Sequence, residues 1–277
     1  KCTDTMFYLF STNTDREIFR FGREGRGVCE FYYPFFLVNS FAYDSLIIYD
    51  SPAATLTKID LAALVESRDI AKCANSEHLY RNLNFMYNFN KVDSAFIGTF
   101  IEKDEGLFSF CNRNNGEIKN TDYVPYYFYE KGRKDAYCHH VLVSEKDNSI
   151  IVPFKYMNLI NCYDLDGNLK VTYALDWIKE EINTQIRVDE HTTVTFYRTY
   201  ATRNRCYLVW DGHKIEEELR KYPAKIVVMN WQGELEKVYQ LDNFADFIIP
   251  DEKQRMIYVG VYNAGLEFVE IYKYPML

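Results

Sequence analysis

Residues 21–36, FGREGRGVCEFYYPFF, decide how the chain begins to fold. Three glycines, Gly22, Gly25 and Gly27, interrupt two aromatic-rich runs in this stretch. Glycine adopts backbone conformations that other residues resist, so the chain can turn sharply here. A hairpin-like segment precedes the stretch and a new series of strands follows it. We therefore expect residues 21–36 to connect the end of one small sheet to the start of the next.

The composition of the whole chain favours strands. Of its 277 residues, 48% are hydrophobic and 17% aromatic, and aromatic rings pack well on the pleated surface of a sheet. The net charge of −8 argues against a ligand with a phosphate backbone, so we expect no nucleic-acid partner. No run of about 18 apolar residues occurs, so we expect no membrane span.

The seven cysteines are widely spaced, and no C-x-x-C pair occurs among them. This spacing does not support a zinc ribbon or a thioredoxin-like site, and the odd number excludes a fully paired disulfide framework. We expect most of the thiols to be reduced and buried in strands. Cys2 lies near the start of the chain, but Lys1 is not the small residue that a lipid-attachment site needs. The sequence therefore leaves the presence of a lipid anchor as an open alternative.

A unit of strand, turn and strand recurs five times along the chain. Asn115-Gly116, Asp166-Gly167 and Gln232-Gly233 lie where a tight hairpin needs a positive φ. In each of the five units, the strand before the turn has two polar residues followed by apolar ones. These strands are residues 44–50, 93–101, 148–155, 204–211 and 254–262. The three glycines are 51 and 66 residues apart, which fits one four-stranded blade per interval with an insertion in the longer one.

These repeats predict an all-β fold: residues 1–277 form a single six-bladed β-propeller of four-stranded antiparallel blades. A β-sandwich is the competing architecture, but its connections would vary where these recur. Only two strands precede residue 21, so we expect the first blade to be incomplete or to share a strand with the last one.

Three insertions interrupt the repeat. Residues 61–72 have helical spacing without strong caps, and residues 176–190 read as a short helix or a long loop. Residues 213–224 read as a solvated turn that stops at Pro223.

The connector also carries a family resemblance. Residues 21–34 resemble the FGxxGxGPGEFxxP-like connector of bacterial six-bladed propellers; the matching residues are Gly22, Gly25, Gly27, Glu30, Phe31 and Pro34. Val28 and Cys29 replace the usual Pro-Gly. Together with residues 251–275, this resembles the TolB-like propeller proteins of Gram-negative envelopes. The resemblance implies the fold and an envelope location, in the periplasm or at the outer-membrane surface. It supplies no catalytic residues.

Cys138, His139 and His140 form the densest group of potential metal ligands. Adjacent strand residues face opposite sides, so both histidines cannot bind one metal without a bulge. We expect one core histidine and one that faces a central channel, with no metal site and no cofactor.

Asp164, Asp166 and Asn168 resemble the opening of a calcium loop, but Leu175 stands where that loop needs a glutamate. We expect a hairpin turn instead. Tyr123 and the aromatic residues at 126–129 form the most concentrated aromatic stretch, which would either pack on an outer blade or bind a sugar or a partner.

We predict a non-enzymatic binding or scaffolding propeller of the bacterial cell envelope, monomeric, that holds a protein partner or a glycan. The binding candidates on channel strands and loops are Tyr87, His139, Tyr156, Arg198 and Tyr262. The alternative is a propeller enzyme that acts on carbohydrate at its central funnel.

Catalysis would need two or more carboxylates, or a metal, that converge on the propeller axis. The sequence does not place Asp135, Glu190 and Asp246 relative to one another, and Asp189 to His191 offer an acid/base pair with no identifiable partner. No G-x-S-x-G elbow or sialidase S-x-D-x-G-x-x-W box occurs, which weakens two hydrolase classes.

Overall fold

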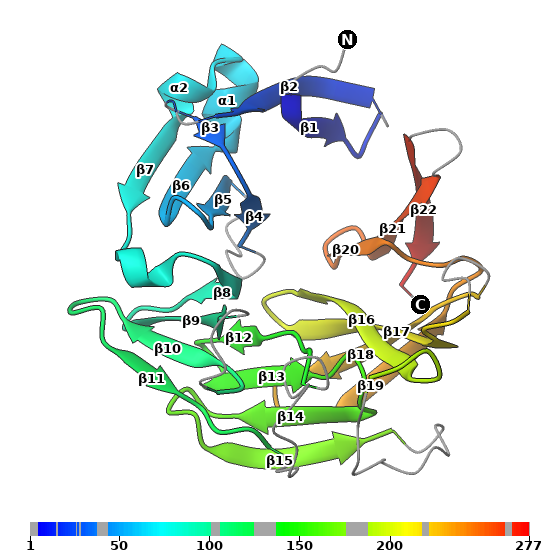
Figure 1. Cartoon of the computed structure of the whole chain (residues 1–277). Coiled ribbons are helices and arrows are strands. Elements are labelled where there is room, and N and C mark those ends of the chain that lie inside the picture. The colour runs from blue at the N-terminus through cyan, green and yellow to red at the C-terminus, as the bar shows by residue number, and fades with distance from the viewer. Residues whose placement is uncertain are drawn as a thin grey trace. The chain divides into compact units, whose positions relative to one another are not determined.

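The chain is all-β, with six sheets in succession along the sequence (Figure 1). The structure, a computed structural model, describes residues 5–14, 16–25, 27, 29–37, 44–100, 106–124, 137–175, 188–217, 222–263 and 268–276. Strand pairing is antiparallel except where the short strand β3 runs parallel to β2. The six sheets are the blades of a six-bladed β-propeller fold, as the repeats predict.

The internal contacts of the chain divide it into two compact units. Lys1–Lys103 and Ser109–Lys119 form the first unit, and Asp104–Phe108 and Asn120–Leu277 form the second. The expectation of a single domain stays a prediction.

The first unit holds sheets with the strand orders β1-β2-β3, β4-β5-β6-β7 and β11-β10-β9-β8. Its elements are β1 Thr5–Ser11, β2 Arg16–Glu24, β3 Glu30–Phe31, β4 Pro34–Phe36, β5 Ser45–Asp50, β6 Thr55–Asp60, α1 Leu61–Ser67, α2 Ile70–Cys73, β7 Ala74–His78, η1 Arg81–Leu83, β8 Met86–Lys91, β9 Ala95–Phe100, β10 Ser109–Asn112 and β11 Ile118–Asn120. The first sheet has three strands, so the expectation of an incomplete first blade is confirmed.

The second unit holds the sheets β12-β13-β14-β15, β16-β17-β18-β19 and β20-β21-β22. Its elements are β12 Leu142–Ser144, β13 Ser149–Pro153, β14 Leu159–Tyr163, β15 Leu169–Ala174, β16 Thr193–Ala201, β17 Arg205–Lys214, β18 Lys225–Asn230, β19 Leu235–Gln240, β20 Phe247–Asp251, β21 Met256–Asn263 and β22 Phe268–Pro275. The last sheet, formed by strands between residues 244 and 275, has three strands, as the sequence of this segment predicts.

The repeat takes the same place in successive sheets. The recurring strands are β5, β9, β13, β17 and β21, each the second strand of its sheet. Gly116, Gly167 and Gly233 have φ of +72°, +86° and +85° and lie in the turns between third and fourth strands. The predicted hairpins are therefore confirmed, and each marks the outer hairpin of a blade.

Residues 61–72 replace this hairpin in the second sheet. Helices α1 and α2 join β6 to β7, so the predicted helical insertion is confirmed. The expectation of weak caps is wrong, because Asp60 and Asp69 cap the two helices. Their carboxylates accept hydrogen bonds from the backbone N–H groups of Ala63 at 2.9 Å and Ala71 at 3.1 Å. None of the helices in the described ranges is long and apolar enough to cross a membrane.

The connector at residues 21–36 joins the first two sheets, as predicted: β3 ends one and β4 begins the next. The Gly27 N–H donates to Glu30 Oε2 at 2.7 Å, which closes the turn. A side chain at Gly22, where φ is +75°, would lie 2.7 Å from the Phe7 ring. Cys29, where the motif that this connector resembles has a glycine, has a φ of +63°.

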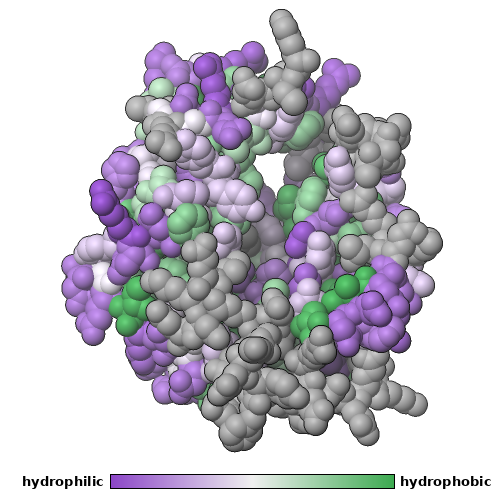
Figure 2. All heavy atoms as spheres, in the orientation of Figure 1, coloured by the Kyte–Doolittle hydropathy of each residue, from purple (hydrophilic) through white to green (hydrophobic). Residues whose placement is uncertain are grey.

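Neighbouring sheets in a unit pack face to face through apolar side chains. One cluster combines Phe7, Phe21 and Phe31 of the first sheet with Ile48 and Ile59 of the second. Comparable clusters join the second and third sheets and the last two sheets. Figure 2 shows one face of the molecule, where hydrophilic residues predominate among those in colour and apolar residues form small separate groups.

Candidate functional site

Two adjacent β-bulges interrupt the pairing of β16 with β17. The paired residues are Val194 with His213, Phe196 with Trp210, and Arg198 with Val209. From the first pair to the second, β17 carries one extra residue; from the second to the third, β16 carries one extra residue. Bulges occur often beside functional sites because they redirect side chains.

Gly212 makes the first bulge possible. Its φ is +71°, and a Cβ atom there would lie 2.0 Å from the ring of Trp210. Both the left-handed backbone and the close approach of the indole therefore require glycine. Residues 213 and 214 belong to β17, so the expectation that the solvated segment begins at residue 213 is wrong.

The bulge places a carboxyl group and an imidazole inside the unit. Asp211 is 5% exposed and His213 2%, and His213 Nδ1 lies 3.9 Å from Asp211 Oδ2. Within the described residues, neither carboxyl oxygen of Asp211 nor Nε2 of His213 has a hydrogen-bond partner. Buried polar groups are nearly always paired, so these three atoms mark an unusual site.

Burial controls the charge of this pair. It raises the pKa of Asp211 to about 7, a shift that the cations Arg198 and Lys155 oppose and the carboxylate of Asp246 increases. Burial also lowers the pKa of His213 below its ordinary value. Near neutral pH the imidazole of His213 is therefore uncharged, and the carboxyl group of Asp211 is partly protonated and partly ionised.

Beside this pair lies a group that we name the cation–tyrosine cluster: Lys155, Tyr156, Tyr197 and Arg198. The Arg198 guanidinium lies 4.0 Å from the ring centre of Tyr197. The Lys155 ammonium lies 5.1 Å from the same ring centre and 4.9 Å from that of Tyr156. All four side chains are half-buried, so the cluster combines two cations and two rings that solvent can reach.

Backbone contacts hold the cluster in place. Arg198 Nε donates to the carbonyl of Asp246 at 2.9 Å, and Arg198 Nη2 donates to the Tyr197 hydroxyl at 3.1 Å. The Thr195 N–H donates to the carbonyl of Lys155 at 2.7 Å, which joins β16 to the segment that carries Lys155 and Tyr156. The arginine is thus oriented before any ligand arrives.

The two adjacent histidines have different surroundings. His139 is buried, with Nδ1 2.6 Å from the carbonyl of Tyr137. His140 is half-buried, and its Nε2 donates to the carbonyl of Tyr197 at 3.0 Å, beside the cluster. Loss of solvent lowers the pKa of each to about 4. Among the described residues, no group of three or more His, Cys, Asp or Glu side chains could hold a metal ion.

The predicted binding residues are only partly brought together. Tyr156 and Arg198 belong to the cluster, and the exposed Tyr262 joins it indirectly, because its N–H donates to Asp246 Oδ2 at 2.6 Å. Tyr87 belongs to the first unit, where its ring lies edge-on to Phe35 at 5.5 Å. A binding role for His139 stays a prediction.

Of the two candidate carboxylates among the described residues, the structure brings Asp246 to the cluster but not Glu190. Glu190 is exposed, 3.7 Å from the ring of His191. Asp135 and residues 126–129 lie outside the described residues. Tyr123 is half-buried against Tyr137, with ring centres 4.8 Å apart.

The candidate calcium loop is a hairpin turn, as predicted. Asp164 Oδ1 accepts from the backbone N–H groups of Asp166 at 3.1 Å and Asn168 at 2.8 Å, and Oδ2 pairs with Lys170 Nζ at 2.7 Å. Burial alone would raise the pKa of Asp164, but Lys170 and Asn168 hold it well below its usual value. Both carboxylate oxygens of Asp164 therefore have partners within the hairpin.

None of the six described cysteines forms a disulfide, in keeping with the expectation of reduced thiols. Cys111, Cys162 and Cys206 are buried, Cys29 and Cys73 are half-buried, and Cys138 is exposed. Burial in strands therefore holds for half of them.

The first unit has a pocket of about 530 Å³ beside the connector. Several polar groups that line it already bond one another: Glu30 accepts from Gly27, and the hydroxyls of Thr57 and Ser76 lie 2.8 Å apart. The stronger candidate site is therefore the cation–tyrosine cluster with Asp211 and His213 behind it.

Solved structures share this fold. A member of the DUF4221 family from Bacteroides vulgatus matches with a TM-score of 0.55 and 11% identity, over 97% of this chain and 86% of that one. At this identity the likeness shows the fold alone.

Two further matches are more distant. A streptogramin B lyase has a TM-score of 0.44 and 14% identity, over 86% of this chain and 67% of that one. A functionally unknown protein from Desulfotomaculum acetoxidans has a TM-score of 0.43 and 13% identity, over 96% and 74%. No protein-family model and no curated protein matches the chain. None of the three structures is described as TolB-like, so that resemblance stays a prediction.

Proposed function

We propose that this chain is a non-enzymatic binding propeller of the bacterial cell envelope and that the cation–tyrosine cluster binds an acidic glycan. The observation that carries the proposal is that both Lys155 and Arg198 lie against the ring of Tyr197, at 5.1 and 4.0 Å from its centre. The envelope location rests on the sequence resemblance to TolB-like propellers.

The chemistry of the cluster fits a sugar with a carboxylate. Tyrosine rings offer a flat apolar surface with a polar tip, which suits the face of a sugar ring. Arginine presents a planar fork of donors to a carboxylate, and lysine adds a second charge. An acidic glycan would bring a negative charge to both cations of the cluster, which a neutral glycan would not.

Thermal unfolding with oligosaccharides tests the proposal. Oligogalacturonate at about 100 times its dissociation constant should stabilise the protein by about 2.7 kcal/mol, and maltohexaose should not. We expect Arg198→Gln and Lys155→Gln each to weaken the effect. The matched controls Arg203→Gln and Lys146→Gln, at exposed turn positions, should retain it. Equal stabilisation by the neutral sugar, or full stabilisation of both cluster variants, would contradict an acidic glycan.

The second candidate is a propeller enzyme that acts on acidic carbohydrate. The observation in its favour is Asp211, whose pKa of about 7 suits proton transfer near neutral pH, 3.9 Å from the neutral imidazole of His213. Prolonged incubation of oligogalacturonate with the protein, followed by chromatography of the sugar, distinguishes the two. Shortened products that Asp211→Asn abolishes would favour the enzyme; an unchanged sugar favours the binding protein.

A further inference from the structure

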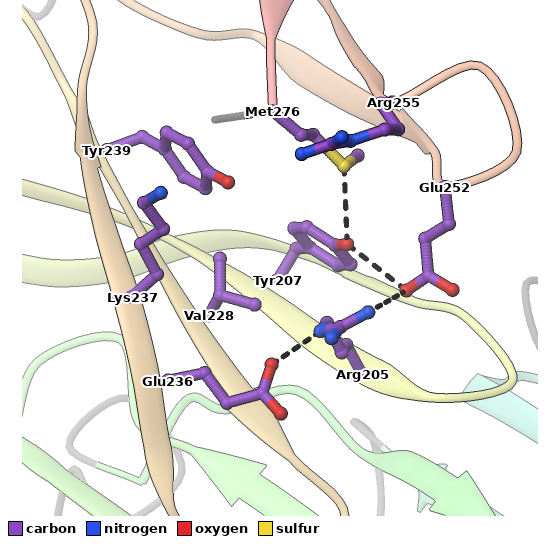
Figure 3. Close-up of a pocket in the computed structure, with 9 residues that line it drawn as sticks. All are labelled: Arg205, Tyr207, Val228, Glu236, Lys237, Tyr239, Glu252, Arg255 and Met276. Atoms are coloured by element: carbon purple, nitrogen blue, oxygen red, sulfur yellow. Dashed lines mark hydrogen bonds and ion pairs between the residues drawn. The ribbon is translucent and has the colours of Figure 1, made fainter.

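A pocket of about 380 Å³ on β17, β18 and β19 of the second unit is crossed by its own polar contacts (Figure 3). The Arg205 guanidinium contacts both Glu236 and Glu252, and Glu252 also accepts from the Tyr207 hydroxyl at 3.1 Å. These contacts join β17 to β19 and to the turn between β20 and β21. They indicate that the polar groups of this pocket hold strands together, so we turn to the pocket of the first unit.

The pocket of about 530 Å³ beside the connector has four polar side chains from β6 and β7 in its lining. In the register of these two strands, Thr55 is opposite His78 and Thr57 is opposite Ser76. Directly opposite residues of an antiparallel pair lie on one face of the sheet, and so do residues two apart on one strand. The four side chains therefore form one polar surface that faces the pocket.

This surface keeps hydrogen-bonding capacity for a ligand. Thr57 Oγ1 and Ser76 Oγ lie 2.8 Å apart, and two hydroxyls that share one hydrogen bond still have one O–H left to donate. His78 Nδ1 lies 3.3 Å from Thr55 Oγ1, while its Nε2 makes no hydrogen bond with the described residues. Ser76 and His78 are exposed. The surface thus offers donors and acceptors side by side, which suits a polyol, because each of its hydroxyls both donates and accepts.

The connector adds a carboxylate to the same pocket. Glu30 is half-buried, and its Oε2 accepts from the Gly27 N–H at 2.7 Å. Its Oε1 has no hydrogen-bond or ion-pair partner among the described residues. A Cβ atom at Gly25 would lie 2.2 Å from Glu30 Oε2, so a side chain at residue 25 would displace the carboxylate. The glycines of the connector therefore leave room for a carboxylate with one oxygen available.

The charge of the lining selects the kind of polyol. The described lining residues include two carboxylates, Glu30 and Asp50, and neither a lysine nor an arginine. Asp50 uses both oxygens within the connector, where they accept from the backbone N–H groups of Tyr32 and Tyr33 at 2.9 Å each. Glu30 is therefore the carboxylate that can bind a ligand, and it favours a positively charged group.

We propose that this pocket binds an amino sugar, a small polyol that carries an ammonium group. Glu30 Oε1 would accept from the ammonium group, and Thr57, Ser76 and His78 would bond the sugar hydroxyls. The volume of the pocket lies within the range of small-molecule sites. This site goes beyond the proposed acidic-glycan function, because it lies in the other unit and selects a ligand of the opposite charge.

Calorimetric titration of the full chain with glucosamine tests the proposal. Glucose and N-acetylglucosamine keep the hydroxyls but lack the ammonium group, and butylamine keeps the ammonium group but lacks the hydroxyls. At about pH 6 the amine of glucosamine is protonated and a glutamate is ionised. We expect glucosamine to bind about tenfold more tightly than each of the other three, since only glucosamine uses both parts of the pocket.

Two variants separate the two parts of the site. Glu30→Gln keeps an oxygen for the Gly27 N–H and removes the charge, so it should lower the affinity for glucosamine about tenfold and leave that for glucose unchanged. Ser76→Ala, at an exposed position, should weaken both sugars. Glu24→Gln removes the same charge from an exposed residue of β2 that does not line the pocket, and it should bind as the wild type does.

Three outcomes would overturn the proposal. Glucosamine that fails to bind, or binds no more tightly than glucose, would show that the ammonium group is not recognised. Butylamine that binds as tightly as glucosamine would remove the role of the polar surface on β6 and β7. Unchanged glucosamine affinity in both Glu30→Gln and Ser76→Ala would place the ligand elsewhere. Arg198→Gln, which alters the cation–tyrosine cluster, should leave glucosamine binding intact.

Discussion

Asp211 combines deep burial with a group that water would normally solvate. Its side chain is almost fully enclosed, and within the described residues it accepts no hydrogen bond. Arg198 and Lys155 favour the ionised form but do not outweigh burial, so the pKa rises to about 7. The free energy of unfolding therefore depends on pH through the ionisation of Asp211.

The raised pKa of Asp211 predicts how stability changes with pH. The unfolded chain loses this proton near pH 4 and the folded chain near pH 7, so the free energy of unfolding falls as pH rises through that window. The full effect is up to about 4 kcal/mol, since each pKa unit corresponds to about 1.4 kcal/mol. Asp211→Asn cannot ionise and should lack this loss.

Urea denaturation of both proteins at pH 4.5 and pH 8 measures the effect. The drop in unfolding free energy between the two pH values should be smaller in Asp211→Asn than in the wild type. Asp242→Asn, at an exposed position of the same unit, should retain the wild-type drop. An identical drop in all three proteins would show that Asp211 is ionised in the folded chain at both pH values.

At the scale of elements, the connector has a defined backbone conformation at Cys29, where the sequence departs from the motif that it resembles. Cys29, at the position where the motif that the connector resembles has a glycine, has a left-handed backbone with φ of +63°. The turn therefore holds strain in a residue that has a side chain.

This strain predicts that Cys29→Gly stabilises the protein by about 1 kcal/mol, because glycine adopts a positive φ without steric cost. Cys29→Ala is the matched control: it also removes the thiol but keeps the Cβ atom and therefore the strain. Thermal or urea unfolding of the two variants gives the answer. If Cys29→Ala is as stable as Cys29→Gly, loss of the thiol and not relief of backbone strain accounts for the gain in stability.

The sequence predicts the blades better than it predicts the site, for a reason that lies in β17. Asp211-Gly212 has the composition of a turn, so the strand appears to end at Asp211 and His213 appears solvated. In the structure the same pair forms a bulge, and β17 continues to Lys214. Local composition cannot separate a bulge from a turn, because both need a residue with positive φ; only the pairing with β16 decides between them.

Arg198 and Tyr156 could be predicted because they lie on strands and loops that the repeat already placed. Lys155 and Tyr197 were missed, although the alternation of cations and tyrosines at residues 155–156 and 197–198 is a signal that could have found them. Their proximity depends on Thr195, which bonds β16 to residues 154 to 157. A contact between segments about 40 residues apart has no signature in either segment alone.

At the scale of the whole molecule, the chain passes between its two units three times, after Lys103, Phe108 and Lys119. Strand β11, Ile118–Asn120, contains the last of these crossings. No single cut in the sequence separates the units, and β11 has residues in both, so unfolding of either unit would disrupt this strand. We therefore expect the two units to unfold together, in keeping with the prediction of a single domain over residues 1–277.

Calorimetry with one core variant in each unit tests this cooperativity. Ile48→Ala in the first unit and Ile151→Ala in the second remove side chains that are 0% exposed, and each should cost about 2–5 kcal/mol. If the chain unfolds as one, both variants lower the temperature of the same single transition, and the calorimetric and van't Hoff enthalpies agree. If the units are independent domains, the wild type shows two transitions or a broadened one, and each variant shifts only its own part. Because each variant perturbs a core within one unit, a shift of one common transition by both variants would mean that the two units unfold cooperatively.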